Sequence, residues 1–537
     1  MIRTTKIIIL LLALFCAIYI TVNFLWLKAD TNSLSWDPAT HAHIITVFNK
    51  YINSHSLLSL LLNREILLTD VRYPPLLHLS VIPLLNFFPV KDVDAMVVAM
   101  NIIFLPILVF SVFGIGKIMF DEKAGFLAAY LTAMYPFSIA ASRYLILEFP
   151  LMAMVALLIY LFLRSDDFRR PAFSLFFGVI MGLGMLLKQT FIFFAISVIA
   201  YFFTRLYLSR KTRTDNPKRI SNLCAALFIC LLVCGWWYFY AFTQSFKVDK
   251  SVPFYFKFLN PLWRFLPVDL KIWKGIIQFY PIVLLSQISI PFALMFLISL
   301  PSYIKGRLKY KYLPVFFIIS ALFMHTFFFT KDLRYIIPIF TGFALITALG
   351  FFSILNIRLC RVGIWIIITF SLLNFYGAAS GKEFTRLFRP QTAEMLWIYS
   401  PYYSPYIRQE DWKMGEVVEF LKKISAKAHV KDKNPVVLTG LNHIVYNSQT
   451  VRYYSAAESL NLEVIALPYL DDPVGMLKSR QYDMLLYKDR KNLGIAPLKL
   501  VAIDAFLKSR PEYLSIVYQV NLPDNSSIII YRCQREK

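Results

Sequence analysis

Ionisable residues lie at the edges of long apolar runs in five separate segments of this chain. The two candidate catalytic carboxylates, Asp37 and Glu148, are accompanied by at least four lysines or arginines and by two histidines. Arginine offers forked donors and lysine a compact charge, so these cations suit a phosphate, and a nearby carboxylate suits a general base. The combination predicts group transfer from a phosphate-linked donor to a hydroxyl or an amine. The segments contain, in chain order, Asp37, His41 and His43; Arg72 and Tyr73; Arg143 and Glu148; Lys188; and Lys331, Asp332 and Arg334.

The composition indicates a membrane protein. Of the 537 residues, 58% are hydrophobic and 16% are charged, and the mean hydropathy is +0.58. Soluble domains average about a quarter charged residues. The formal charge of +24 fits lysines and arginines gathered in cytoplasmic loops and against anionic headgroups. We therefore expect membrane lipids as partners and no nucleic acid.

The basic loops predict the topology. Positive clusters occur at 117–123, 164–171, 209–219, 304–312 and 357–361, and we place each on the cytoplasmic side. The first apolar run is longer than the core of a signal peptide, so we expect it to remain as the first span. The result is a protein of about eleven transmembrane helices with its C-terminus outside. The predicted spans are 7–27, 95–116, 122–142, 149–164, 172–188, 190–208, 221–241, 276–300, 312–330, 335–356 and 361–378.

Two outer segments are expected to lie at the membrane surface. The run PPLLHLSVIPLLNFFP (74–89) is short and contains four prolines. It predicts an interfacial or re-entrant helix inside a first outer loop of about 28–94, in which other segments also have amphipathic patterns. The stretch 244–275 is rich in aromatic residues and prolines and is expected at the outer interface as well.

The composition changes near residue 381, and the remainder predicts a small soluble α/β domain. KNPVVLTG (433–440) and YDMLLYKD (482–489) are typical of strands, and 513–533 is typical of a hairpin with its turn at PDNSS. Residues 411–428 and 471–481 favour helices. The predicted fold is therefore an all-α polytopic membrane domain, 1–380, with a C-terminal extracytoplasmic α/β domain, 381–537.

The charged outer residues also have ordinary structural explanations. An arginine or lysine at a helix end can extend its charge to the interface. Arg143 and Glu148 share a short turn and can form a local ion pair. Asp37 precedes Pro38 and can cap the next helix or turn the chain.

The histidines and cysteines do not predict a metal site. His41 and His43 are two residues apart, which does not place them on one helical face, so a zinc pair is disfavoured. His325 lies inside a predicted span and is expected to pack in the core. No cysteine spacing suggests a disulfide framework or zinc ligation. We expect neither a metal nor a cofactor.

The order of the outer motifs resembles a known group of enzymes. An acid follows the first span, and after it come YPPL, an arginine–tyrosine–acid turn, a lysine between two spans and an outer arginine–tyrosine pair. This order resembles the GT-C glycosyltransferases, specifically the family of protein O-mannosyltransferases and lipid A aminoarabinose transferases. The resemblance covers about residues 1–380. It implies a GT-C fold, a polyprenyl-phosphate sugar as donor and transfer on the outer or lumenal face.

The first three motifs match the family with two departures. Asp37 in SWDPATHAH matches the family's loop acid, the presumed base or acceptor-orienting group, but Pro38 stands where a second acid is common. YPPLLHL (73–79) resembles the His/Tyr-Pro-Pro-Leu segment that shapes the donor site. SRYLILEFPL (142–151) resembles the Arg-Tyr-x-x-x-Asp-x-Pro-Leu turn, with Glu148 in place of the commoner aspartate.

The last two motifs supply cations. GLGMLLKQTF (182–191) resembles the Gly-x-x-x-Leu-x-Lys-Gly element, with Gln189 in place of glycine, and LRYIIPIF (333–340) resembles an Arg-Tyr-x-x-Pro element whose arginine is expected near the donor phosphate. The resemblance thus implies catalytic roles for Asp37 and Glu148, phosphate contacts from Lys188, Arg334, Arg72 and Arg143, and substrate positioning by His41, Tyr73 and Tyr335.

The predicted function is transfer of a sugar to an extracytoplasmic protein, lipid or glycan, with inversion at the anomeric carbon. The absence of an obvious retention signal favours a bacterial inner membrane. A lipid or solute transporter or flippase is the main alternative, although transporters place ionisable residues near the bilayer midplane. An O-antigen-ligase-like transferase and a non-catalytic scaffold remain as further alternatives.

Overall fold

The chain forms two compact units in the computed structural model. The first comprises Met1–Leu27 and Asn63–Ile407, and the second comprises Lys28–Leu62 and Arg408–Lys537. Most of the predicted interfacial segment 244–275, the stretch 381–406 and Lys331 lie outside the residues that the structure describes. The structure describes residues 2–31, 34–70, 72–85, 87, 93–208, 216–248, 284, 287–326, 332–354, 357–380, 407, 410–428, 434–441, 443, 445–460, 462–489, 497–509 and 511–534.

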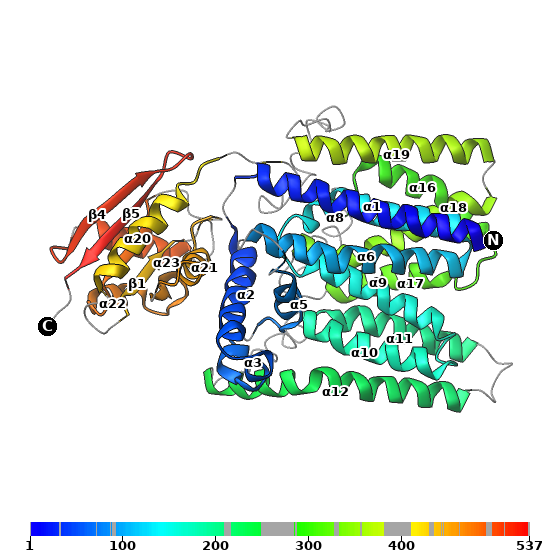
Figure 1. Ribbon diagram of the computed structural model, residues 1–537, viewed down its shortest axis with the longest axis horizontal. Helices are drawn as coiled ribbons and strands as arrows, with labels where there is room; N and C mark the ends of the chain where they lie inside the picture. The colour runs from blue at the N-terminus through cyan, green and yellow to red at the C-terminus, as the bar shows by residue number, and fades with distance from the viewer. Residues whose placement is uncertain are drawn as a thin grey trace, which may run out of the picture. The chain divides into compact units, whose positions relative to one another are not determined.

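The first unit is a bundle of helices (Figure 1). Consecutive helices pack against each other, as in the pairs α6–α7 and α9–α10, and α16 packs against the non-consecutive helix α18. Each predicted span overlaps a helix within the residues that the structure describes. Its described helices are α1 (Ile2–Ala29), α4 (Arg64–Leu67), α5 (Leu76–Leu85), α6 (Val93–Met119), α7 (Glu122–Met134), α8 (Pro136–Ser142), α9 (Glu148–Arg164), α10 (Pro171–Leu187), α11 (Phe191–Leu208), α12 (Asn216–Val248), α16 (Ile290–Lys305), α17 (Tyr312–Thr326), the 3-10 helix η2 (Leu333–Ile339), α18 (Phe340–Ile354) and α19 (Ile357–Ser380).

Several of these helices have the length and composition of membrane spans. Within the described ranges, five are long and apolar enough to cross a membrane, and six if the bent pair α7–α8 counts as one span. The remaining predicted spans coincide with shorter helices. The prediction of a polytopic helical membrane protein is confirmed, and the number eleven stays a prediction.

The predicted span 122–142 is broken into α7 and α8. The two helices meet at an angle of 64°. Pro136 is the first residue of α8, and Tyr135 before it has an extended backbone with φ −59° and ψ 138°. A proline disfavours helical conformation in the residue that precedes it, so the Tyr-Pro pair bends the chain just before Arg143.

The proline-rich run 74–89 contributes a short buried helix. Helix α5 has 10 residues, which is about 15 Å and about half of a hydrocarbon core. Leu77, His78 and Val81 are fully buried, and α5 packs against α6 and α10. Between the two predicted possibilities, this burial favours a re-entrant position over an interfacial one.

An ionic cluster closes the loop between α9 and α10. Asp166, Asp167 and Phe168 adopt left-handed conformations with φ between 51° and 63°, which is unfavourable for residues other than glycine. The carboxylate of Asp167 lies 2.9 Å from Arg205 and 3.6 Å from Arg219, and Arg219 Nε also donates to the Asp167 carbonyl at 2.9 Å. We call Asp166, Asp167, Arg205 and Arg219 the inner cluster, because the basic loops predict this end of the bundle to face the cytoplasm.

The second unit contains a mixed five-stranded sheet. The strand order is β2-β1-β3-β5-β4, in which β2, β1 and β3 are parallel and the β3–β5 and β5–β4 pairs are antiparallel. Strand β3 is buried along its whole length, as expected for a parallel strand covered on both faces. The strands are β1 (Val436–Gly440), β2 (Glu463–Ala466), β3 (Met484–Lys488), β4 (Leu514–Asn521) and β5 (Ser527–Cys533).

Helices cover both faces of this sheet. Side chains of α20 and α21 pack with Val437 and Met484 on one face, and those of α22 and α23 pack with Leu438 and Leu485 on the other. The predicted strands, hairpin and two helices are present, and the sequence analysis missed β2, α21 and α23. The helices are α20 (Met414–Ala428), α21 (Ser448–Ala457), α22 (Pro473–Lys478) and α23 (Pro497–Lys508).

Helices from the first outer loop join the second unit. Helix α2 (Trp36–Ser54) packs against α21, and Lys50 Nζ donates to Ser459 Oγ at 2.8 Å and to the Ala456 carbonyl. Helix α3 (Leu57–Leu62) follows it. The sequence analysis placed residues 28–62 with the transmembrane domain, whereas these contacts group them with the C-terminal strands and helices.

Candidate functional site

Two helix ends bring together an acid and a cation in the first unit. Glu148 is the first residue of α9, and Lys188 immediately follows α10. A carboxylate at a helix N-terminus and a cation at a C-terminus are both favoured by the helix dipole. Lys188 Nζ lies 2.6 Å from Glu148 Oε1, and the side chains are only 14% and 3% exposed. This is an ion pair that is largely removed from water.

A second pair adjoins it at the start of η2. Asp332 caps η2 and accepts a hydrogen bond from the Arg334 main-chain nitrogen at 3.0 Å. The Arg334 guanidinium also donates two hydrogen bonds to this carboxylate, from Nε to Oδ1 at 3.0 Å and from Nη2 to Oδ2 at 2.7 Å. Arg334 Nε lies 3.9 Å from Glu148 Oε1. We call Glu148, Lys188, Asp332 and Arg334 the outer cluster.

The electrostatics of the outer cluster keep Asp332 ionised. Burial alone would raise the pKa of Asp332, but the charge and hydrogen bonds of Arg334, with Lys188 nearby, lower this pKa below its ordinary value. Tyr335 also contacts the outer cluster, because Lys188 Nζ lies 4.8 Å from the centre of the Tyr335 ring. The sequence analysis noted Asp332 without giving it a role. The Asp-x-Arg spacing at a helix start was the available signal, because an aspartate cap can bind the main chain and side chain of the same arginine.

The loop that carries Arg72 is tied to the same end of the bundle. Gln189 Nε2 donates to the Arg72 carbonyl at 3.2 Å, so the glutamine that departs from the family motif has a structural contact. The Arg72 side chain is 45% exposed and pairs with Asp70 at 2.5 Å, and its guanidinium lies 5.4 Å from the Tyr73 ring. Arg72 is therefore connected to the outer cluster through Gln189, the neighbour of Lys188 in the chain. The contacts found for its side chain are with Asp70 and Tyr73.

Arg143 is held in a different environment. It is 1% exposed, and its Nε donates to Asn23 Oδ1 of α1 at 3.0 Å. Its guanidinium lies 5.1 Å from the Trp26 ring and 5.5 Å from the Phe375 ring. The sequence analysis considered a local ion pair between Arg143 and Glu148, but the ion-pair partner found closest to Glu148 is Lys188. Arg143 links α8 to α1 and α19.

Asp37 and the two histidines lie on α2 of the second unit. The N-cap of α2 is Ser35, and Asp37 occupies the first turn, so Asp37 is not the capping residue. Pro38 is in the same first turn, where a proline is tolerated. His41 is 2% exposed and lies one turn after Asp37 on the same side of the helix, whereas His43 is half-buried on another side.

The outer cluster has the chemistry of an anion site. Glu148 takes one of the three N–H donors of the Lys188 ammonium, and a guanidinium offers five in a fixed plane. Cations shielded from water bind an anion more strongly than exposed ones. In the described part of the chain, no group of three or more His, Cys, Asp or Glu side chains is arranged to hold a metal ion.

Comparisons with known proteins agree with this picture. Residues 84–239, which include Arg143, Glu148 and Lys188, match the family described as dolichyl-phosphate-mannose-protein mannosyltransferase. No curated protein sequence matches the chain significantly.

Solved structures share the fold over most of the chain. The structure of ArnT from Cupriavidus metallidurans bound to undecaprenyl phosphate is 12% identical, with 96% of this chain and 97% of that chain covered and a TM-score of 0.59. The apo oligosaccharyltransferase of Archaeoglobus fulgidus is 11% identical, with coverages of 96% and 74% and a TM-score of 0.52. Residues 84–239 are therefore similar to this mannosyltransferase family, and nearly the whole chain shares the fold of these solved structures.

Proposed function

We propose that this enzyme transfers a sugar from a polyprenyl phosphate to an acceptor outside a bacterial inner membrane, where its C-terminal unit also lies. The observation that carries the proposal is the outer cluster, in which Lys188 and Arg334 are 14% and 11% exposed at adjoining helix ends. Buried charges at a membrane boundary are costly and usually functional. The ArnT structure contains undecaprenyl phosphate, which supports a donor of the same chemical class here.

In this proposal, the donor phosphate lies against Lys188 and Arg334. Arg72 and Arg143 are secondary candidates, because one pairs with Asp70 and the other with Asn23. Glu148 and Asp332 hold the two cations in place, and Tyr335 and Tyr73 shape the pocket around the sugar. His41 is assigned to positioning a substrate.

The proposed reaction is a displacement at the anomeric carbon. An acceptor hydroxyl or amine loses its proton to Asp37 and forms the new bond to carbon, while the carbon–oxygen bond to the phosphate breaks with inversion. The phosphate leaves on the polyprenol with one additional negative charge, which Lys188 and Arg334 stabilise. No metal or cofactor is needed in this scheme.

Donor binding tests the phosphate site. We expect purified wild-type protein to bind a short-chain polyprenyl-phosphate sugar saturably, and Lys188→Ala and Arg334→Ala to weaken binding at least about tenfold, since a hydrogen bond to a charged group is worth about 1.5–3 kcal/mol. Lys188→Gln keeps a donor for Glu148 and covers the case in which alanine prevents folding. Lys218→Ala, an exposed cation in α12, is the control. Equal affinity in all variants would remove the phosphate site.

Turnover tests the acid. Asp37→Asn should lower the single-turnover rate by about 10²–10⁴-fold, the usual contribution of one acid–base group, with donor affinity unchanged. Asp411→Asn changes an exposed acid of the same unit, 70% exposed, and should behave as wild type. A near-normal rate in Asp37→Asn would exclude Asp37 as the base.

A further inference from the structure

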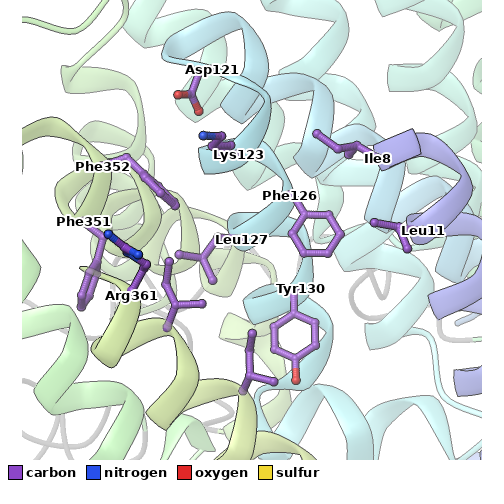
Figure 2. A pocket seen from close by; sticks show the side chains of 12 residues that line it. Ile8, Leu11, Asp121, Lys123, Phe126, Leu127, Tyr130, Phe351, Phe352 and Arg361 are labelled. Carbon is purple, nitrogen blue, oxygen red and sulfur yellow. The ribbon is translucent and has the colours of Figure 1, made fainter. Parts of the chain in front are cut away.

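A pocket lies at the opposite end of the first unit from the outer cluster. It has a volume of about 540 Å³ and lies between α1, α7, α18 and α19 (Figure 2). This is within the range of about 300–1,000 Å³ that is usual for small-molecule sites. Leu11, Leu127, Phe351 and Ile364 provide apolar wall from each of the four helices. The pocket is therefore lined mainly by side chains suited to a hydrocarbon chain.

The far end of the pocket is closed by contacts between the same helices. The hydroxyl of Tyr130 lies 2.6 Å from Ser371 Oγ, which links α7 to α19. The ring of Tyr130 lies 5.5 Å from that of Phe15, which links α7 to α1. Tyr19 stacks on Phe375 at 5.0 Å, which links α1 to α19. Figure 2 shows Tyr130 at the end of the pocket away from Asp121 and Lys123. The pocket thus ends partway along the bundle and opens toward one end.

Charged side chains also line the pocket. Lys123 and Arg361 provide two cations, and Asp121 provides one carboxylate. Asp121 is the N-cap of α7 and accepts a hydrogen bond from the Ala124 nitrogen at 2.8 Å, which occupies one of its oxygens. The three groups sum to one positive charge. A phosphodiester carries one negative charge, and lysine and arginine at headgroup depth attract such groups.

We propose that this pocket holds one glycerophospholipid of the inner leaflet, with its phosphate between Lys123 and Arg361 and an acyl chain among the apolar walls. The polyprenyl tail of the donor is the other candidate occupant. A polyprenyl tail is uncharged, so it matches the apolar walls of the pocket but not the charges of Lys123 and Arg361. Helix α9 alone separates the two ends by 17 residues, or about 25 Å, so the phosphate of one donor cannot lie at both. The proposal is independent of the assignment of the outer cluster.

Native mass spectrometry of the full-length protein, released from mild detergent, tests the proposal. We expect wild type to retain one phospholipid and the double variant Lys123→Ala/Arg361→Ala to lose it. Both residues are exposed, so this variant should fold. Ile364→Trp, which fills the pocket without changing charge, should lose the lipid as well.

Lys218→Ala/Arg307→Ala is the matched control. It removes the same two charges from exposed positions on the same predicted side of the membrane and should retain the lipid. Equal retention by wild type and both pocket variants, equal loss by the control, or a retained mass that corresponds to a polyprenyl phosphate would each overturn the proposal.

Lipid titration gives an independent reading. Adding synthetic phosphatidylglycerol or phosphatidylethanolamine to the delipidated protein should raise the Tm of wild type, and the Lys123→Ala/Arg361→Ala variant should need at least about tenfold more lipid for the same shift. If neither lipid changes the Tm of wild type, the site does not bind phospholipid.

Discussion

The outer and inner clusters consist of the same kinds of charged residue at the two ends of one bundle, yet their charged groups have different hydrogen-bond and ion-pair partners. In the inner cluster, Asp167 and Arg219 are 1% and 2% exposed, and Arg219 and Asn222 also bond to main-chain carbonyls of the loop. In the outer cluster, Lys188 and Arg334 are partly exposed, and the partners found for their charged groups are side-chain carboxylates. The inner cations bond to the main chain of a loop, whereas the outer cations pair with carboxylates at the ends of helices.

The carboxyl groups of the two clusters show the same contrast. Burial raises the pKa of Asp167 above its ordinary value despite Arg205 and Arg219. At Asp332 the burial effect is outweighed by Arg334 and Lys188, and the pKa is lowered. Positive potential therefore dominates at the outer end and desolvation at the inner end.

The largest expected effect comes from breaking the inner cluster. Asp167→Ala leaves Arg205 and Arg219 without their buried carboxylate, and removal of one partner of a buried pair costs about 3–5 kcal/mol of unfolding free energy. Thermal unfolding in detergent should show a large drop in Tm, and donor affinity per folded molecule should not change. Asp166→Ala, at a 33% exposed carboxylate, should cost much less. If Asp167→Ala weakened donor binding as much as Arg334→Ala, the two clusters would not differ in role.

In the second unit, burial also shifts the pKa of a histidine, His443. Burial, and then the charge of Lys488, lower the pKa of His443 to about 4. The unfolded chain takes up a proton near pH 6.5 and the folded unit only near pH 4, so stability is fully present above pH 6.5 and falls as the pH drops toward 4. Between pH 7 and pH 5 the loss in unfolding free energy should be about 2 kcal/mol.

Pulse proteolysis of the full-length protein at pH 7 and pH 5, read at cleavage sites within 408–537, measures this effect. His443→Gln should flatten the difference between the two pH values. An equally steep pH dependence in that variant would assign the effect to other groups.

The smallest expected effect is the loss of donor affinity in Arg334→Lys, which separates the role of charge from that of hydrogen-bond geometry in the outer cluster. Arg334→Lys keeps the charge but loses the planar fork that grips Asp332, and a lysine does not replace a bidentate arginine. Donor affinity should fall about tenfold, which is about 1.4 kcal/mol, and less than in Arg334→Ala. Wild-type affinity in Arg334→Lys would show that charge alone matters at this position.

The sequence predicted those parts of the fold whose signals are local. Strands β1 and β3 are apolar runs, and the β4–β5 hairpin has its turn residues between alternating segments, so each was found from its own residues. Strand β2 was missed because EVIA has only four residues. Helix α21 was missed because its sequence, SQTVRYYSAA, is largely polar, and it is covered by α2 from a distant part of the chain.

The candidate site shows the same limit. Short motifs indicated Glu148, Lys188 and Arg334, but only tertiary packing pairs Glu148 with Lys188 across 40 residues. Arg143 has a motif as clear as the others, and its contact with Asn23 on the first helix could not be predicted from spacing. The assignment of the segment 28–62 to the C-terminal unit likewise depends on contacts between the two ends of the sequence.

The discontinuous second unit has a consequence for the order of synthesis. Helix α2 leaves the ribosome right after the first apolar helix, but its partner α21 and the sheet behind it are made last. The contacts of the helix that carries Asp37 with α21 can therefore form only when translation is almost finished. A nascent chain can thus insert its apolar helices before the contacts between α2 and α21 are able to form.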